Sequence, residues 1–237
     1  MKERLVDYEH DGLALQGLLA VDDEAGGLRP GVLVAHAWGG RSEFEDQTAR
    51  RLAEGGYAGF ALDLYGRGVR GSNRDENAAL IAPFLEQRSL LQARIASAVS
   101  TLQAQPEVDS NRIAAIGYCF GGLSVLDLAR SGADVRGVVS LHGLFNPPEP
   151  APGVPIRAKV LALHGHLDPM VPVEAVNALE AELTAAGADW QIHSYGSAMH
   201  AFTNPKANDP EFGTVYNAAA DRRSWVATTN FLAEVLA

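Results

Sequence analysis

A tight turn between a strand and a helix, with the chain's one cysteine at its centre, constrains this sequence more than any other feature. The apolar run at residues 112–116 is typical of a short buried strand, and residues 123–130 are typical of a helix. Between them, residues 117–122 place Cys119 with one glycine two positions before it and another two positions after it. These glycines let the strand and the helix approach without a Cβ clash, while the tight turn strains the backbone of the central residue.

The position of Cys119 favours a reactive thiol. The N-terminus of the following helix would direct free N–H groups and the positive end of the helix dipole at the sulfur, which favours the thiolate. The alternative is a buried structural cysteine, because free cysteine is among the most buried residue types. That alternative does not explain the paired glycines or the strand-to-helix context. The pattern therefore predicts a nucleophile elbow, with sulfur where such turns usually carry a serine.

Strands and helices are predicted to alternate along most of the chain. The expected strands cover residues 31–35, 57–62, 113–116, 137–141, 159–163 and 190–195, after a hairpin formed by residues 5–8 and 13–21. The other expected helices cover residues 43–54, 78–105, 173–186 and 214–236, with Pro83 near a kink or boundary and a proline-rich surface loop at 145–155. This order predicts an α/β protein with the α/β-hydrolase fold. We expect a mostly parallel central sheet with helices on both faces, in a single domain over residues 1–237.

Composition narrows the class of protein. The 237 residues are 47% hydrophobic and 20% charged, which is ordinary for a folded globular chain. A formal net charge of −10 disfavours binding to nucleic acid or to an anionic membrane, and one cysteine excludes an intramolecular disulfide. The N-terminus is charged where a signal peptide is apolar, and no apolar stretch is long enough to span a membrane. We expect a cytoplasmic monomer without nucleic-acid or membrane partners.

A cysteine nucleophile needs a base, and the base needs an orienting acid. In α/β-hydrolases the chain order is nucleophile, acid and then histidine. Asp168 comes just after the strand predicted at 159–163, and His200 lies in the loop after the strand predicted at 190–195. The carboxyl ends of parallel strands meet at one edge of a sheet, so these side chains are expected to come together. The sequence predicts Cys119, Asp168 and His200 as a catalytic triad.

The other histidines need a separate interpretation. His36 and His142 each end a predicted strand, so we interpret both as residues of the substrate pocket or directly behind it. His10 lies in the N-terminal strand region and is expected at the surface. His193 lies inside a strand and is expected to be structural.

A His-x-His-x-Asp run raises the alternative of a metal site. His164, His166 and Asp168 are spaced so that they would share one side of an extended strand, but the chain turns at Gly165 and Pro169. A zinc site would also need a fourth partner or an open water position. We therefore expect no metal and no cofactor. A plain turn residue before proline is the remaining alternative for Asp168.

An oxyanion hole needs two backbone N–H groups. One is expected from Phe120, directly after the nucleophile, and the other from the loop after the first central strand. Trp38 is the predicted donor in that loop, with Ala37 as the alternative. Trp38, Tyr65 and Phe145 are also predicted to form apolar walls of the pocket, although core packing explains each aromatic residue equally well.

At these residues the sequence resembles the dienelactone hydrolase family. The matching pieces are residues 62–66 (Leu-Asp-Leu-Tyr-Gly), 117–122 (Gly-Tyr-Cys-Phe-Gly-Gly), 164–172 and 200–202 (His-Ala-Phe), in the family's order. The resemblance implies a triad of Cys119, Asp168 and His200. It also implies hydrolysis of a small unsaturated lactone bearing a carboxylate, or of related small esters, which is the carboxymethylenebutenolidase type of activity. The family uses neither cofactor nor metal.

Two positions depart from the family pattern. Well-described members carry a glutamate in the oxyanion loop, where this sequence has Ala37, so His200 is expected to activate the thiol alone. Those members also bind the substrate carboxylate with an arginine soon after the catalytic histidine, where residues 201–205 hold none. Four other arginines could cross near the cleft or remain as solvated surface charges: Arg67, Arg70, Arg74 and Arg88.

The leading functional hypothesis is hydrolysis of a small ester or lactone through a thioester on Cys119, with a small molecule as the partner. A thioesterase is an alternative use of the same turn, whereas an acid dehalogenase of this fold would need an aspartate nucleophile. A non-catalytic alternative is a sensor whose thiol reports oxidation or captures electrophiles, which the two departures favour. The intact turn, Asp168 and His200 favour catalysis.

Overall fold

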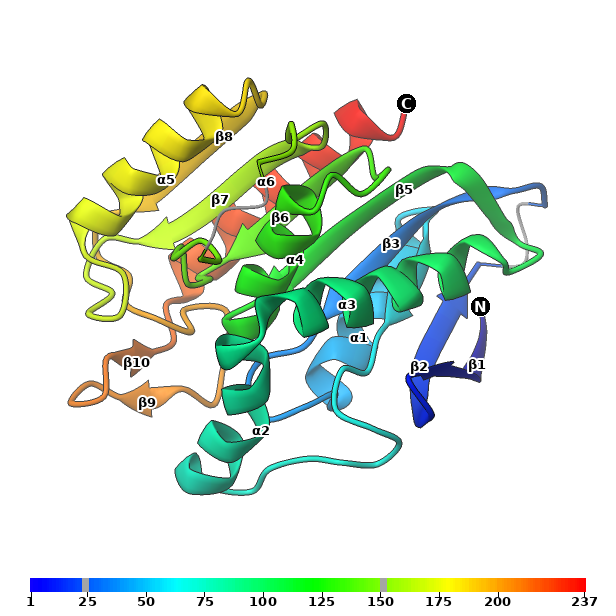
Figure 1. Ribbon diagram of the computed structural model, residues 1–237, viewed down its shortest axis with the longest axis horizontal. Helices are drawn as coiled ribbons and strands as arrows, with labels where there is room; N and C mark the ends of the chain where they lie inside the picture. The colour runs from blue at the N-terminus through cyan, green and yellow to red at the C-terminus, as the bar shows by residue number, and fades with distance from the viewer. Residues whose placement is uncertain (23–25, 150–152) are drawn as a thin grey trace.

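Eight strands form one mixed sheet at the centre of the computed structural model, which describes residues 1–22, 26–149 and 153–237 (Figure 1). The strands are β1 (Lys2–His10), β2 (Leu13–Val21), β3 (Arg29–Ala35), β4 (Ala58–Ala61), β5 (Val108–Tyr118), β6 (Gly137–Leu141), β7 (Lys159–Gly165) and β8 (Trp190–Tyr195). Their order in the sheet is β1-β2-β4-β3-β5-β6-β7-β8. The β1–β2 and β2–β4 pairs are antiparallel and the other pairs are parallel, which confirms the predicted sheet and its N-terminal hairpin.

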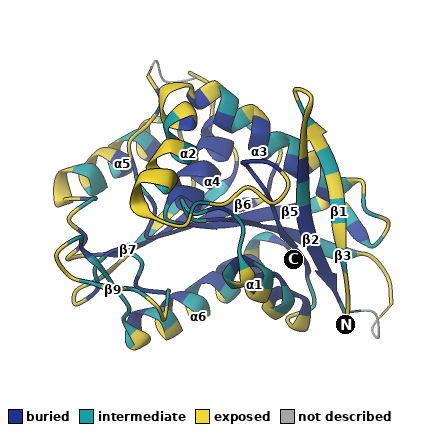
Figure 2. Ribbon diagram, turned by 90° about the horizontal axis from the view of Figure 1, so that it is seen from below, coloured by how far each residue is buried: buried dark blue, intermediate teal, exposed yellow. Residues whose placement is uncertain are grey.

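Helices cover both faces of this sheet (Figure 2). On one face lie α1 (Glu43–Glu54) and α6 (Ala218–Val235). On the other lie α2 (Arg74–Glu86), α3 (Arg88–Gln103), α4 (Phe120–Arg130) and α5 (Val173–Ala185). This arrangement confirms the predicted fold class, a mostly parallel central sheet with helices on both faces.

The central strands are buried on both faces, which explains their continuous apolar runs. In β3, Leu33 packs into the cluster that contains residues of α3 and α4, whereas Val32 and Val34 pack into the cluster that contains residues of α1 and α6. Successive residues of a strand point to opposite faces, so a strand between two helical layers needs apolar residues at every position. The two clusters hold the sheet rigid beneath the loops at its edge.

The structure corrects two predicted helices. The region predicted as one helix over 78–105 begins earlier, because the Asn73 side chain caps α2 by accepting from the Glu76 N–H. It divides at Gln87, one helical turn after Pro83, so a boundary lies near this proline as predicted. The last helix begins at Ala218, after the Asn217 cap, and not at residue 214. The preceding residues instead form the small hairpin of β9 (Asn208–Asp209) and β10 (Thr214–Val215).

Part of the loop predicted at 145–155 also differs. Phe145 is buried rather than exposed, while Asn146 and Pro147 lie at the surface as expected. Residues 150–152 lie outside the described residues. In the described parts of the chain, no helix is both long enough and apolar enough to cross a membrane.

The carboxyl ends of the parallel strands meet at one edge of the sheet, where the candidate residues gather (Figure 1). Cys119 directly follows β5, and His142 directly follows β6. Asp168 comes shortly after β7, and His200 comes shortly after β8. The fold therefore brings together residues that are widely separated in the sequence, as expected for an open parallel sheet.

Candidate active site

Cys119 lies at the strained turn between β5 and α4. Its backbone φ is 55° and ψ is −115°, a conformation that costs a residue with a side chain on the order of 1–3 kcal/mol. A Cβ on Gly117 would lie 2.1 Å from the Gly121 carbonyl oxygen, and a Cβ on Gly121 would lie 2.2 Å from the Ala35 carbonyl oxygen. The predicted need for both glycines is confirmed by these close approaches. The turn lifts the sulfur out of the strand and holds it at the start of α4.

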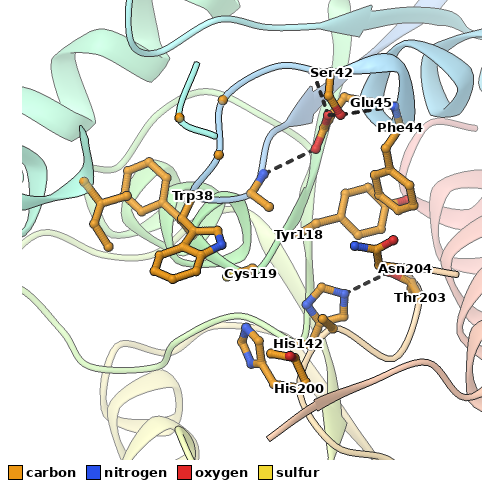
Figure 3. A pocket seen from close by; sticks show the side chains of 18 of the residues that line it. Trp38, Ser42, Phe44, Glu45, Tyr118, Cys119, His142, His200, Thr203 and Asn204 are labelled. Carbon is orange, nitrogen blue, oxygen red and sulfur yellow. Dashed lines mark hydrogen bonds between the residues drawn. The ribbon is translucent and has the colours of Figure 1, made fainter. Parts of the chain in front are cut away.

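His200 and Asp168 form a buried pair next to this turn. The His200 Nδ1 and Asp168 Oδ2 atoms are 2.7 Å apart, and Asp168 Oδ1 accepts from the Met170 N–H at 2.8 Å. The other ring nitrogen of His200, Nε2, is buried and has no hydrogen-bond partner among the described residues. The ring lies next to Cys119 (Figure 3). The structure thus brings the three predicted triad residues together.

The charges of Cys119 and His200 stabilise each other. Burial opposes ionisation of the Cys119 thiol, but the neighbouring His200 and the backbone N–H groups of Phe120 and Trp38 outweigh burial and lower its pKa. Burial also opposes the His200 imidazolium, but the Cys119 thiolate and the hydrogen bond to Asp168 raise its pKa to about 10. Both shifts move the two groups toward a thiolate–imidazolium pair.

The loop after β3 presents a backbone donor to the sulfur. The N–H of Trp38 faces Cys119 together with that of Phe120, which are the two donors expected for an oxyanion hole. The Tyr65 hydroxyl donates to the Trp38 carbonyl oxygen at 2.9 Å and fixes the loop from the outside. The N–H of Ala37, the alternative donor, is directed at Glu45 Oε1, 3.4 Å away.

Glu45 is a site residue that the sequence analysis missed. It is buried, lines the cavity and belongs to the first turn of α1. Its Oε2 atom accepts from the Ser42 N–H at 2.8 Å and from the Ser42 hydroxyl at 2.7 Å, which completes a capping box. The Ser-x-x-Glu spacing of that box was readable in the sequence, but its reach to Ala37 was not. Glu45 therefore ties the loop after β3 to α1.

A cavity of about 370 Å³ opens in front of Cys119. Its walls are mostly apolar and include Trp38, Phe44, Tyr118, Leu144, Met170 and Phe212. Of the predicted pocket residues, Ala37, Trp38 and His142 line it. A cavity of this size suits a small-molecule ligand.

Three predicted pocket residues do not line the cavity. His36 is completely buried, with Nδ1 2.7 Å from the Ala37 carbonyl oxygen and Nε2 accepting from the Leu64 N–H, so its ring holds backbone together. Tyr65 supports the loop through its hydroxyl, as described above. Phe145 packs against His164, with ring centroids 5.7 Å apart. Their positions at strand ends correctly predicted the edge of the sheet at which these residues lie, but did not show which way each side chain points.

His142 does face the cavity, in an uncommon conformation. Its φ is 40°, in the left-handed region that side chains other than glycine rarely adopt. Its Nε2 lies 2.8 Å from the Thr203 hydroxyl oxygen, and its ring centroid lies 5.3 Å from that of His200. Burial and the charge of His200 keep the pKa of His142 well below its usual value. Its Nδ1 is buried without a partner among the described residues and is turned away from Thr203, toward Cys119 (Figure 3).

The remaining histidines differ in their surroundings. His10 is half-buried rather than fully at the surface, and Arg94 Nε donates to its Nδ1 at 3.0 Å. His193 is exposed on the edge strand β8, so the predicted structural role is not supported by any burial. His166 is exposed while His164 is buried, and no three His, Cys, Asp or Glu residues within the described ranges are grouped as metal ligands would be.

One of the four candidate arginines reaches the cavity. Arg70 lines the cavity, is exposed, and forms no ion pair with the carboxylates that the structure describes. The other three are held by carboxylates: Arg67 pairs with Asp7, Arg74 with Asp209 and Arg88 with Asp127. The sequence could not separate Arg70 from the others, because the loop after β4 has no regular structure from which to read its direction.

The β9–β10 hairpin closes the outer side of the cavity. The His200 N–H donates to the Gly213 carbonyl oxygen at 2.9 Å, and the Val215 N–H donates back to the His200 carbonyl oxygen at 3.1 Å. These bonds fix the backbone on which the catalytic candidate sits. From the same hairpin, the Phe212 ring stacks on Trp38 with centroids 5.8 Å apart. This hairpin was not predicted from the sequence, because the helix predicted over residues 214–236 included β10.

The comparisons with known proteins agree with this arrangement. A family model described as "Dienelactone hydrolase family" matches residues 15–236. This chain belongs to the dienelactone hydrolase family. Among solved structures, one named "m3DLH" is 38% identical with a TM-score of 0.95, and covers 100% of this chain and 99% of its own.

Two other known proteins are also similar to this chain. A dienelactone hydrolase-like promiscuous phosphotriesterase, P91 from metagenomic libraries, is 35% identical with a TM-score of 0.95 and covers 100% of this chain and 99% of its own. The Caenorhabditis elegans protein K02A2.1 is 37% identical over 158 residues, which are 64% of this chain and 98% of that protein. The family assignment therefore holds across nearly the whole chain, and it identifies the protein as one of a family of hydrolases.

Proposed function

We propose that this protein hydrolyses small carboxylic esters or lactones through a thioester on Cys119. The observation that carries the proposal is the geometry at the turn, where His200, held 2.7 Å from Asp168, lies next to Cys119. This arrangement lowers the pKa of Cys119 and raises that of His200 to about 10. A thiolate is the reactive form of cysteine, and an imidazolium beside it is ready to give a proton to a leaving group. The dienelactone hydrolase family membership supports the same class of reaction.

In the first half of the reaction the Cys119 thiolate attacks the ester carbonyl carbon. The carbonyl oxygen takes up negative charge and is held by the N–H groups of Phe120 and Trp38, which face this point. The carbon–oxygen bond to the leaving group then breaks, and His200 Nε2 gives its proton to the departing alkoxide. Asp168 keeps the His200 ring in the orientation that this transfer requires.

In the second half a water molecule releases the acyl group. Neutral His200 takes a proton from the water, the resulting hydroxide attacks the thioester, and the sulfur leaves as the thiolate. His142 is placed to orient this water, because its Nδ1 is buried, unpartnered among the described residues and turned toward the space in front of Cys119. Its lowered pKa keeps the ring neutral, so it can hold water without competing for the charge of His200.

The cavity favours small substrates with good leaving groups. A volume of about 370 Å³ and mostly apolar walls suit an activated ester or an enol lactone better than a peptide. Amides are poorer substrates than esters for this thiolate, because an amine leaving group must be protonated before its bond to carbon breaks. Arg70 is the cation available at this cavity for a substrate that carries a carboxylate.

Turnover of p-nitrophenyl acetate and of dienelactones by the wild type and Cys119→Ala tests the assignment. We expect the substitution to lower kcat by at least about 10⁴-fold, as loss of a nucleophile does, and iodoacetamide to inactivate the wild type. Undiminished turnover after either treatment would overturn Cys119 as the nucleophile. A burst of acyl-enzyme without steady turnover would favour a thiol sensor, and a preference for acyl thioesters over oxygen esters would favour a thioesterase.

A second candidate activity is hydrolysis of phosphotriesters. It is favoured by the 35% identity and TM-score of 0.95 to P91, which is described as a promiscuous phosphotriesterase. The same thiolate could attack phosphorus and the same N–H groups could hold the phosphoryl oxygen. Comparing kcat/KM for paraoxon with that for p-nitrophenyl acetate separates the two, since both release p-nitrophenol. We expect the acetate to be preferred.

A further inference from the structure

A second hollow of about 710 Å³ lies beside the catalytic cavity, between α1 and α6. The two helices lie on the same face of the sheet (Figure 2). The hollow and the cavity share six lining residues: Ser42, Phe44, Arg70, Tyr118, Thr203 and Asn204. The two spaces are therefore neighbours that share one set of lining residues, and we call the space between the helices the α1–α6 groove. Its boundary with the cavity is the edge-to-face pair of Phe44 and Tyr118, with centroids 4.8 Å apart.

The α1–α6 groove carries an excess of positive charge. Arg51, Arg70 and Lys206 line it, and none forms an ion pair with a carboxylate in the described parts of the chain. The chain as a whole has a formal net charge of −10, so three unpaired cations along one groove oppose the overall field. Arg51 is also held in place, because its guanidinium lies 3.8 Å from the centroid of the Trp225 ring.

Two acidic residues, Glu43 and Asp221, also line the groove, so the cations outnumber them by one. Glu43 is paired with Arg50 at 2.7 Å. Asp221 accepts from the Tyr216 hydroxyl at 3.1 Å, and burial raises the pKa of this carboxyl, an effect that the nearby charge of Arg51 opposes. Arg70 and Lys206 therefore remain exposed in the groove and available to an anionic ligand, with Arg51 beside them.

We propose that the α1–α6 groove binds an anionic group, a carboxylate or phosphate, carried at the far end of an elongated ester substrate. This inference rests on the proposed function, because it assigns the distal part of the molecule whose ester group meets Cys119. The reacting ester occupies the small cavity, the connecting chain passes Phe44 and Tyr118, and the anionic end reaches Arg51 and Lys206 in the groove. The substrate class is thus a long ester with a terminal anion, rather than a compact neutral ester.

A substrate series with one leaving group tests this assignment. The probes are p-nitrophenyl monoesters of straight-chain dicarboxylic acids of increasing length, each compared with the same ester carrying a terminal carboxamide. Above the length that spans the cavity, the carboxylate probes are expected to show the higher kcat/KM, and added salt is expected to reduce the difference. Equal kcat/KM for charged and neutral probes at every length would overturn the proposal.

Matched variants identify the groove as the source of the preference. Arg51→Gln and Lys206→Gln are each expected to lower kcat/KM for the long carboxylate probe by about twofold to fivefold, the effect of one exposed charge contact. Turnover of p-nitrophenyl acetate should not change. The control is Arg157→Gln, which removes an equally exposed arginine that lines neither space. An equal loss of kcat/KM in the control, or no loss in either groove variant, would overturn the proposal that the groove binds the anion. The preference would then come from the electrostatic field of the whole protein.

A binding measurement keeps this inference separate from the proposed chemistry. Titration calorimetry of the Cys119→Ala variant with the intact carboxylate and carboxamide probes reports affinity without turnover. Tighter binding of the carboxylate, lost in Lys206→Gln on the same background, supports the groove even if the ester is not hydrolysed. Equal affinities would overturn the groove while leaving hydrolysis of p-nitrophenyl acetate, and so the proposed function, intact.

Discussion

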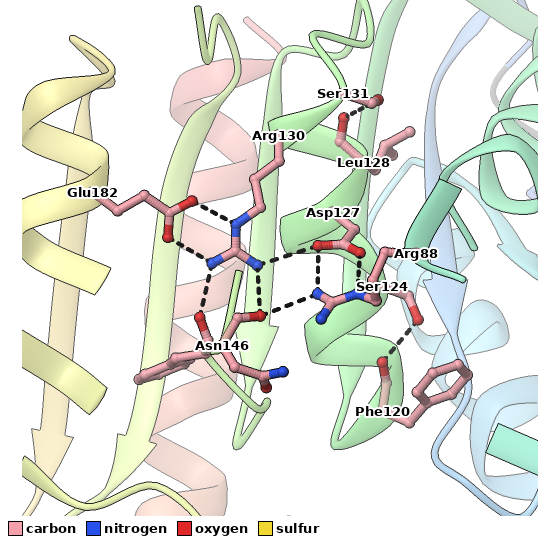
Figure 4. Close-up of polar contacts among 10 residues, drawn as sticks. Arg88, Phe120, Ser124, Asp127, Leu128, Arg130, Ser131, Asn146 and Glu182 are labelled. Atoms are coloured by element: carbon pink, nitrogen blue, oxygen red, sulfur yellow. Dashed lines mark hydrogen bonds and ion pairs between the residues drawn. The ribbon is translucent and has the colours of Figure 1, made fainter. Parts of the chain in front are cut away.

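The two ends of α4 are built in opposite ways. At its N-terminal end, Cys119 has a strained backbone, and buried nitrogens of His200 and His142 have no partners among the described residues. At its C-terminal end, Asp127 and Arg130 are equally buried, yet their charges are matched by partners (Figure 4). The N-terminal end of α4 therefore lies beside unsatisfied groups, where chemistry is proposed, and its C-terminal end carries satisfied groups that stabilise the fold.

The C-terminal network joins several elements across the helical layer. Arg88 Nε donates to Asp127 Oδ2 at 2.6 Å, and Arg130 Nε donates to Glu182 Oε1 at 2.7 Å. Arg130 Nη2 also donates to the Phe145 carbonyl oxygen at 2.8 Å, so the network reaches the loop that follows His142. It fastens α3, α4 and α5 to one another and to that loop (Figure 4). Buried polar groups at the two ends of α4 therefore have different roles. Groups with hydrogen-bond or ion-pair partners stabilise the fold, and groups without partners mark the proposed site of chemistry.

Substituting the aspartate at the active end is expected to have the largest effect. Asp168→Asn preserves shape but removes the charge that orients and stabilises the His200 imidazolium. We expect kcat/KM for p-nitrophenyl acetate to fall by about 10⁴-fold, as for other triads, with little change in the urea midpoint. Activity within tenfold of wild type, about 1.4 kcal/mol, would remove Asp168 from the triad.

The same substitution at the other end is expected to act on stability instead. Asp127→Asn leaves Arg88 and Arg130 as buried charges with too few counter-charges. The free energy of unfolding should fall by about 3–5 kcal/mol, measured by urea denaturation, while kcat/KM of the folded protein stays near wild type. If Asp127→Asn loses activity and keeps stability, the contrast between the two ends of α4 is wrong.

A smaller effect is expected at His142, which sharpens the comparison within the active end. His142→Asn tolerates the left-handed backbone but places no ring nitrogen toward Cys119. Stopped-flow release of p-nitrophenol should show an intact acylation burst and a steady rate lowered on the order of 10²-fold, because only the water step is misaligned. Thr203→Val, which frees the ring without removing it, is the milder control. Equal loss in burst and steady phases would argue against a role in the second step.

The smallest expected effect is that of pH on kcat/KM across the neutral range. The thiolate is lost as pH falls through the lowered pKa of Cys119, and the imidazolium is lost as pH rises through the His200 pKa of about 10. The kcat/KM profile for p-nitrophenyl acetate is therefore expected to be a broad plateau with an acid limb and a basic limb. An acid limb near the usual histidine pKa, with no loss of rate near pH 10, would instead show that His200 acts as a neutral base on a thiol.

The sequence predicted the parts of the site that chain order and strand ends determine. Cys119, Asp168 and His200 follow consecutive rules of one fold, so their meeting at the edge of the sheet could be foreseen. His36 follows a strand as well, but the direction of its ring depends on the backbone of Leu64, which no local pattern shows. The same limit applies to the pocket role predicted for Phe145.

Residues whose positions depend on long-range packing could not be foreseen. Glu45 was readable as a helix cap but not as a support for Ala37, because that contact depends on the path of the loop between them. Arg70 and Phe212 lie in irregular segments whose directions are set by neighbouring elements. The pairing of Arg88 with Asp127 spans 39 positions and depends on how α3 packs on α4. Such contacts need the fold before they can be named.

The thiolate–imidazolium pair is the central claim, and the ultraviolet absorbance of the Cys119 thiolate tests it most directly. Because this is the chain's one cysteine, the absorbance difference between wild type and Cys119→Ala reports a single group. Titrated from acid to alkaline pH, the thiolate signal of the wild type should already be present at neutral pH, and should shift to a higher pKa in His200→Asn. A thiolate signal that emerges only near the ordinary cysteine pKa in the wild type would contradict the account.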